Sequence, residues 1–381
     1  MMMHQTENFR RLHHMDNLRA LAMLLGVVFH ASLAYSPMLH FFWLSSDTEK
    51  SASIDVFAWF THLFRMPLFF LIAGFFAVFL LHKRGLTGFL RNRLLRVLTP
   101  LLIFLPLVLW TMYLAIIWAS QNVENPSPVL NFIFMAMDSE QSSEQPISTA
   151  HLWFLYYLCF FYLITAVFWK LGLYQLKQTA LLFKPWVMVV LVPLLFVPGF
   201  YLVNAPHPAP EGLQPLFWPF ILYGLFFLIG SLLYHHQQAI DQLTGYRWWL
   251  LLAGLASYGY FNHRVPAAEG DVLMALSESI TAWYLTLWCV IAGQRYLNQH
   301  NRTFRYIADA SYWIYLIHLP LLMVIQYAML DTAWNLWLEF SLSVLLTMVI
   351  GLLSYALLVR HTPIGWMLNC KRPRASKQQQ H

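Results

Sequence analysis

Residues 15–35 read MDNLRALAMLLGVVFHASLAY, an apolar stretch whose charge-bearing side chains are Asp16, Arg19 and His30. About 20 residues of helix cross the ~30 Å of hydrocarbon in a bilayer. Every backbone N–H and C=O group in lipid must find its partner within the spanning structure. The stretch is therefore predicted to be a transmembrane helix.

Similar apolar runs recur along the whole chain. Ten of them are predicted to span the membrane, at residues 16–36, 54–82, 95–118, 151–169, 185–203, 214–234, 247–262, 271–294, 309–329 and 335–359. The predicted fold class is all-α, a polytopic integral-membrane bundle of about ten helices. No repeat or linker divides it, so residues 1–381 are predicted to form a single domain with short tails at about 1–15 and 360–381.

Composition excludes most other classes. The 381 residues are 59% hydrophobic and 10% charged, whereas an ordinary soluble domain carries about 25% charged residues. Cys159, Cys289 and Cys370 are far apart in the sequence, which argues against a disulfide framework or a zinc site. We expect no metal and no bound cofactor.

The Lys and Arg residues predict the orientation. Of the 23, Lys50 and Arg264 fall in predicted outer loops, Arg19 and Arg65 fall inside spans, and the other 19 lie on one side. The positive-inside rule then places both termini in the cytoplasm. The net charge of +6 is explained by this asymmetry, so no nucleic-acid partner is expected. The predicted location is a bacterial inner membrane, crossed several times.

Ionisable side chains inside lipid are expensive, by ~2.5–3.5 kcal/mol on insertion scales, and so mark functional positions. Arg19 and His30 are eleven residues apart, which places them on one helix face, ~16 Å apart along the axis. Asp16 lies on the same face and can pair with Arg19. The alternative is a snorkelling Arg19 and a hydrogen-bonded core His30.

Two further groups of arginines are candidates. Arg65 lies in the middle of FAWFTHLFRMPLFFLIAGFFA and needs a partner, which could be Glu278, Asp16 or an anionic ligand. Arg91, Arg93 and Arg96 crowd the cytoplasmic entrance of the third span in RNRLLRVLTP. Clustered arginines suit phosphate groups, although anionic lipid and topology explain such a cluster equally well.

Polar residues of three later spans complete the candidate set. His151 and Trp153 open the fourth span in HLWFLYYL, at its outer interface, where Trp is common. Glu278 and Ser279 lie in SESITAWY of the eighth span. Ser311, Tyr315 and His318 fall on one face of the ninth span, in ADASYWIYLIHLPLL.

The chain resembles the integral-membrane acyltransferase type 3 family. The resemblance rests on MDNLRALAMLLGVVFH, FRMPLFFLIAGFFA, RNRLLRVLTP, HLWFL, SES and SYWIYLIHLPL, taken in order over nearly the whole chain. It implies an acyltransferase that moves an acyl group from a cytoplasmic acyl-CoA to a hydroxyl of a periplasmic glycan. Within the family the chain is most similar to a glucan-modifying branch, which implies a succinyl or acetyl donor. The resemblance places Arg19 and His30 at the catalytic core, with Arg65 as a further functional position.

The residue types fit that chemistry. Histidine is the usual base for removing a hydroxyl proton near neutral pH, and Arg65 or Tyr315 could stabilise the oxyanion. Substrate-binding roles are expected for Asp16, Arg91, Arg93, Arg96, His151, Trp153, Glu278, Ser279, Ser311, Tyr315 and His318. Direct transfer and an acyl-enzyme both stay open, as does the oligomeric state. The competing class is a transporter or flippase that uses the same polar stripe as a proton or substrate path.

Overall fold

The computed structural model describes residues 13–138, 148–175, 177–203, 205, 207–265, 271–299 and 301–369. Within these ranges the regular structure is helical, and the β-pairing is limited to an isolated antiparallel bridge between Ser148 and Gly212. The all-α prediction is confirmed. Cys370 and most of both predicted tails lie outside the described residues.

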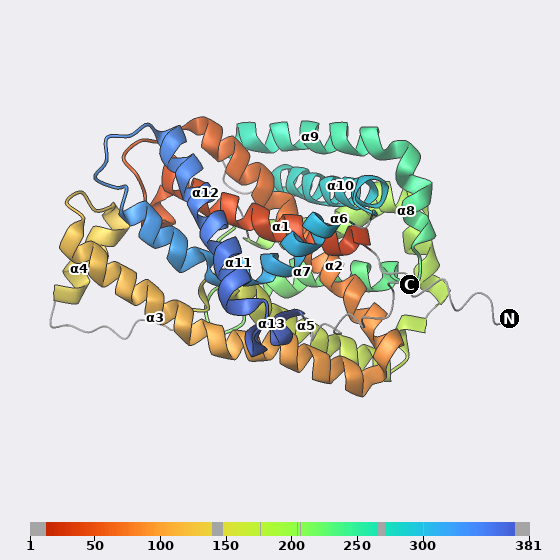
Figure 1. The fold of residues 1–381 in the computed structure, drawn as a ribbon. Coiled ribbons are helices and arrows are strands. Elements are labelled where there is room, and N and C mark those ends of the chain that lie inside the picture. The colour runs from red at the N-terminus through yellow and green to blue at the C-terminus, as the bar shows by residue number, and fades with distance from the viewer. Residues whose placement is uncertain are drawn as a thin grey trace.

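Thirteen α-helices form the described part of the chain (Figure 1). They are α1 His13–Ser32, α2 Ala52–Arg93, α3 Thr99–Asn122, α4 Pro128–Asp138, α5 Trp153–Lys170, α6 Val192–Val203, α7 Trp218–Leu233, α8 Gln238–Leu243, α9 Arg247–Arg264, α10 Val272–Tyr296, α11 Arg302–Tyr327, α12 Leu336–Ser354 and α13 Pro363–Asn369. Wider π-helical turns at Leu94–Leu98, Val187–Leu191 and Tyr355–Val359 adjoin α3, α6 and α12.

The number of spans differs from the prediction. Six helical stretches of the described chain are long and apolar enough to cross a membrane, or up to seven if the pair 218–233 and 238–264, bent by 104°, is one span. Predicted spans two and three fall in one helical stretch, Ala52–Asn122, and span five is the shorter helix Val187–Val203. The count of about ten is therefore not confirmed, because apolar runs do not reveal where helices merge, bend or shorten.

The chain reverses direction inside the long helical stretch. Gly85 leaves the helical conformation, with φ 66° and ψ 178°, and the π-turn of Leu94–Leu98 follows. Figure 1 shows α3 running back along the bundle from the far end of α2. The turn brings Arg93 and Arg96 back toward the first helix.

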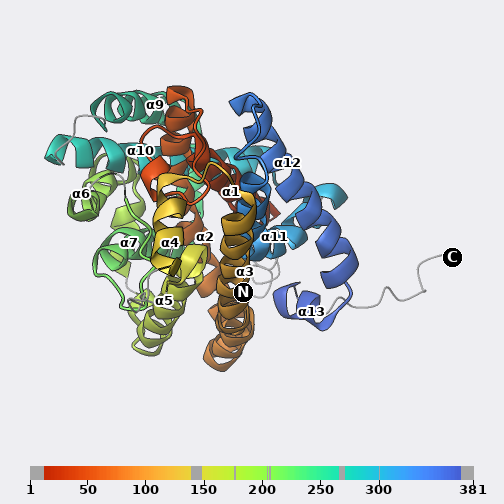
Figure 2. The same ribbon diagram turned by 90° about the vertical axis from the view of Figure 1, so that its left-hand side faces the viewer.

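Helix α1 lies in the middle of the bundle. It packs against α2, α10, α11 and α12, and Figure 2 shows it between a side with α6, α9 and α10 and a side with α12 and α13. Of the apolar stretch of this helix, 61% is buried inside the bundle, whereas only 28% of the apolar stretch of α12 and its π-turn is buried. Outer helices thus keep apolar faces for lipid, and α1 presents Arg19 and His30 to the interior.

Helix α2 is held against α7 by a close backbone crossing. A Cβ atom on Gly74 would lie 1.9 Å from the carbonyl oxygen of Phe227, and one on Gly230 would lie 1.9 Å from that of Leu71. Such distances exclude any side chain, so glycine is required at both positions. The crossing fixes the part of α2 that carries His62 and Arg65.

Candidate active site

Three histidines from distant parts of the chain meet beside α1. His30 comes from α1, His318 from α11, and His151 from the 3₁₀ turn Ala150–Leu152 that precedes α5. His30 Nδ1 lies 2.8 Å from His318 Nε2, and the two rings stack with centroids 5.0 Å apart. The His151 ring meets that of His318 edge-on at 4.7 Å.

The hydrogen bonds of this cluster assign the protons. His318 Nδ1 lies 2.7 Å from the carbonyl oxygen of Tyr315, and a carbonyl only accepts, so His318 carries its proton on Nδ1. Neutral His318 then accepts at Nε2 a hydrogen bond donated by His30 Nδ1. Neutral His30 is left with an unprotonated Nε2, which is the atom that a general base needs.

Two contacts hold His151 against α11. His151 Nε2 donates to the carbonyl of Tyr315 at 3.0 Å, and the Tyr315 hydroxyl donates to the carbonyl of His151 at 2.8 Å. Pro320 lacks an N–H group and cannot bond the carbonyl of Leu316, and the backbone of Leu316 is a further partner of His151. The helix-breaking proline therefore helps to position the histidine.

Arg65 lies buried next to this cluster. Its Cζ is 4.7 Å from the centroid of the Phe29 ring, and it is within electrostatic range of His30, His62 and His318. A Cβ atom on Gly26 would lie 2.7 Å from Arg65 Nη1, so the missing side chain of Gly26 makes room for the guanidinium.

The expected carboxylate partners of Arg65 are engaged elsewhere. Asp16 lies 3.6 Å from Arg19, which confirms that predicted pair. Glu278 Oε1 lies 3.0 Å from His207 Nε2, with both side chains almost fully buried. The proposed ion pairs of Arg65 with Asp16 or Glu278 are therefore wrong, and among the described residues Arg65 forms no ion pair with a carboxylate.

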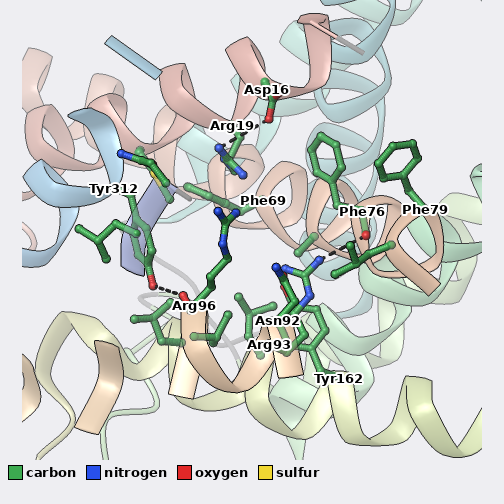
Figure 3. A pocket seen from close by; sticks show the side chains of 18 of the residues that line it. Asp16, Arg19, Phe69, Phe76, Phe79, Asn92, Arg93, Arg96, Tyr162 and Tyr312 are labelled. Atoms are coloured by element: carbon green, nitrogen blue, oxygen red, sulfur yellow. Dashed lines mark hydrogen bonds and ion pairs between the residues drawn. The ribbon is translucent and has the colours of Figure 1, made fainter. Parts of the chain in front are cut away.

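A cavity of about 490 Å³ lies between α1, α2, α5 and α11 (Figure 3). Its polar side carries Asp16, Arg19, Lys83, Arg84, Arg93 and Arg96. Figure 3 shows Arg19, Arg93 and Arg96 pointing toward one another from three directions. The Tyr312 hydroxyl donates to the carbonyl of Arg96 at 2.8 Å, and Arg93 Nη2 donates to that of Phe76 at 3.3 Å.

The inner wall of the cavity approaches the histidine cluster. It contains Met23, Phe69 and Phe154. The Phe154 ring lies 6.4 Å from that of Tyr315, whose carbonyl binds His318. His30, His151 and His318 do not themselves line the cavity, and Phe154 stands between its wall and Tyr315.

Other predicted site residues lie elsewhere. Arg91 is exposed and does not line the cavity. Trp153 is buried and packs on Tyr223. Ser279 donates to the carbonyl of Pro193, and Ser311 bonds the carbonyl of Ala308 at 3.0 Å and Met23 Sδ at 3.5 Å.

His207 is the residue that the sequence analysis missed. It lies in the loop before α7 within APHPAP, residues 205–210, with a φ of 48°. It packs on His62, with centroids 5.6 Å apart and an interplanar angle of 15°. Two features of the sequence could have indicated His207. It lies between two prolines, and the carboxylate of Glu278 needs a partner inside the membrane.

The comparisons with known proteins identify the family of the chain. A family model described as an acyltransferase domain matches residues 12–356. The chain is 27% identical to glucans biosynthesis protein C of Escherichia coli (strain K12) over 368 residues, covering 92% of each chain, and equally so to that of Shigella dysenteriae serotype 1. No solved structure matches. The chain therefore belongs to the acyltransferase 3 family and is a membrane acyltransferase that transfers groups other than aminoacyl groups.

Proposed function

We propose that the protein transfers an acyl group from a cytoplasmic acyl-CoA to a hydroxyl of a periplasmic glycan, and that the glycan is a glucan. The observation that carries the proposal is the chain of contacts from the Tyr315 carbonyl through His318 to His30, which leaves His30 Nε2 unprotonated on the same helix as Arg19 of the arginine-lined cavity. The glucan comes from the name of the relatives.

The donor is assigned to the cavity by charge and size. Acyl-CoA carries several phosphates, and arginine binds phosphate through bidentate, charge-assisted hydrogen bonds. Arg19, Arg93 and Arg96 point into the cavity from three directions. Its volume of about 490 Å³ lies within the range of small-ligand pockets. The positive-inside rule assigns this end to the cytoplasm.

The reaction balances without another group. His30 Nε2 takes the hydroxyl proton while the hydroxyl oxygen attacks the thioester carbonyl. Arg65 stabilises the oxyanion that forms, in a site shielded from water. When the tetrahedral intermediate collapses, the C–S bond breaks, an ester remains, and the CoA thiolate takes the proton from His30.

Release of free thiol tests the proposal. The purified protein in nanodiscs would be given succinyl-CoA or acetyl-CoA, with and without glucan oligosaccharides. Thiol should appear with the acceptor present, and the acyl ester should be found on the glucan by mass spectrometry. A protein that turns over neither donor with any glycan acceptor, but moves a glycan across the membrane, would instead be a transporter.

A further inference from the structure

Five side chains form a continuous buried stack from a cation to an anion. The Arg65 guanidinium lies over the Phe29 ring at 4.7 Å. Phe29 stacks on His62, with centroids 5.1 Å apart and an interplanar angle of 22°, and His62 stacks on His207 at 5.6 Å. Glu278 closes the stack, 3.0 Å from His207 Nε2.

The stack joins four separate parts of the fold. Phe29 comes from α1, His62 and Arg65 from α2, Glu278 from α10, and His207 from the loop before α7. Both charged ends are buried, Arg65 at 7% and Glu278 at 1% exposure. Burying a charge inside a membrane protein is costly, so two opposite charges linked by polarisable rings indicate a built arrangement.

A neighbouring ring fixes the planes of the two imidazoles. Trp59 meets His62 edge-on, with centroids 5.9 Å apart and an angle of 87°, and meets His207 in the same way at 6.0 Å and 79°. Trp59 itself is 1% exposed. Trp59 thus packs against both imidazoles of the stack.

The loop that carries His207 is anchored on the opposite side of the site. Thr149 donates its backbone N–H to the carbonyl of Glu211 at 2.6 Å, and the Tyr156 hydroxyl donates to that of Leu213 at 2.6 Å. These anchors adjoin His151. The loop thus runs from Glu278 to the start of α5 and holds His207 in the stack.

We propose that His207 and Glu278 are positioning residues for acyl transfer, which hold His62 and Phe29 so that the Arg65 guanidinium stays beside His30. Neither residue lines the donor cavity, so their effect is on the chemical step and not on donor binding. The inference rests on the proposed acyl-CoA reaction. It replaces the substrate-binding role predicted for Glu278.

The test compares His207→Asn, Glu278→Gln and the double variant in the thiol-release assay with succinyl-CoA and acetyl-CoA. Asn tolerates the positive φ of residue 207, and Gln keeps the shape of Glu278. Misplacement by about 1 Å can lower a rate by roughly 100-fold, so we expect kcat to fall on that order with the donor KM within about twofold. The double variant should lose no more of its kcat than either single variant, because the effects of substitutions at residues that act as one unit do not add.

Two further variants separate positioning from folding. Glu278→Asp keeps the charge and should recover part of the lost kcat. Phe29→Leu leaves the buried pair intact but removes the ring under Arg65, and should lower kcat in the same way. Tyr284→Phe is the matched control, since it removes a side-chain hydrogen bond of α10 to the carbonyl of Val189, outside the stack and its loop, and should keep wild-type kinetics.

The outcomes decide between the two proposals. Wild-type kcat in Phe29→Leu and in a folded His207→Asn would overturn the positioning role while the proposed function stands. A raised donor KM at unchanged kcat would overturn it as well. If the wild-type protein releases no thiol from either donor with a glucan acceptor, the proposed function fails and this inference fails with it.

Discussion

His30 Nδ1 and His318 Nε2 lie 2.8 Å apart, although 288 residues separate them in the sequence. The hydrogen bond of His318 Nδ1 to the Tyr315 carbonyl gives this contact a direction, because it makes His318 the acceptor. His318 thus orients the base in the way that a third group orients the histidine of a catalytic triad.

His30→Gln tests the base itself. Glutamine keeps a polar side chain of similar size but cannot take up a proton, so thiol release should fall by roughly 100-fold or more, the scale of a lost general base. Thermal unfolding should change little. Substantial turnover in a folded His30→Gln protein would move the base role to another histidine of the cluster.

Two substitutions at His318 separate orientation from packing. In His318→Gln the amide oxygen can still accept from His30 Nδ1, so the variant should keep measurable activity. His318→Leu fills the space without an acceptor and should lose roughly tenfold more, about 1.4 kcal/mol, which is within the value of one hydrogen bond. Equal activity of the two folded variants would show that the contact does not orient His30.

Arginines of the cavity should govern donor affinity. Arg93→Ala and Arg96→Ala should each raise the apparent KM for acyl-CoA by roughly tenfold, since a hydrogen bond to a charged group is worth about 1.5–3 kcal/mol. Arg91→Ala is the matched control, because Arg91 is exposed and does not line the cavity. An equal effect of all three would favour a general attraction to anionic lipid instead.

Helical periodicity predicted the parts of the site that lie along one helix. The pairing of Asp16 with Arg19 and the shared face of Arg19 and His30 follow from 3.6 residues per turn. Periodicity does not say which helices meet, so the contact of His30 with His318 was not predicted. The predicted stripe on α11 faces α1 at both of its ends, because Ser311 lies beside Met23 and His318 lies beside His30.

Features that depend on the path of a loop or on the bend of a helix could not be predicted from the sequence. His207 is brought to Glu278 by a loop whose path is fixed by contacts with the start of α5. The spans predicted at 214–234 and 247–262 form a pair bent by 104°. Hydrophobicity is similar in a straight and in a bent segment, so it could not distinguish them.

Topology can be measured with reporter fusions. Fusions after Asn125 should report the periplasm, since three crossings precede that residue if the Ala52–Asn122 stretch crosses twice. Fusions at the C-terminus should report the cytoplasm if the shorter helix Val187–Val203 crosses the membrane once and the bent pair 218–264 crosses it twice, which makes the total number of crossings even. A periplasmic C-terminus would instead show an odd number of crossings and would contradict the predicted orientation of the C-terminus.

Gly26 offers a way to displace Arg65 without removing its charge. In Gly26→Ala the new Cβ would lie 2.7 Å from Arg65 Nη1, which is too close, so the guanidinium must move away from α1. Alanine favours a helix over glycine by about 1 kcal/mol, so α1 itself should not be weakened.

The expected result for Gly26→Ala is a kcat lower by roughly 10- to 100-fold with an unchanged donor KM, because stabilisation of the oxyanion depends on the position of the charge. Gly259→Ala in α9 is the control, since its Cβ would meet nothing within 4 Å. Wild-type kcat in Gly26→Ala would show that Arg65 can shift without loss of function, and the oxyanion would then have to be stabilised by another group, such as the Tyr315 hydroxyl.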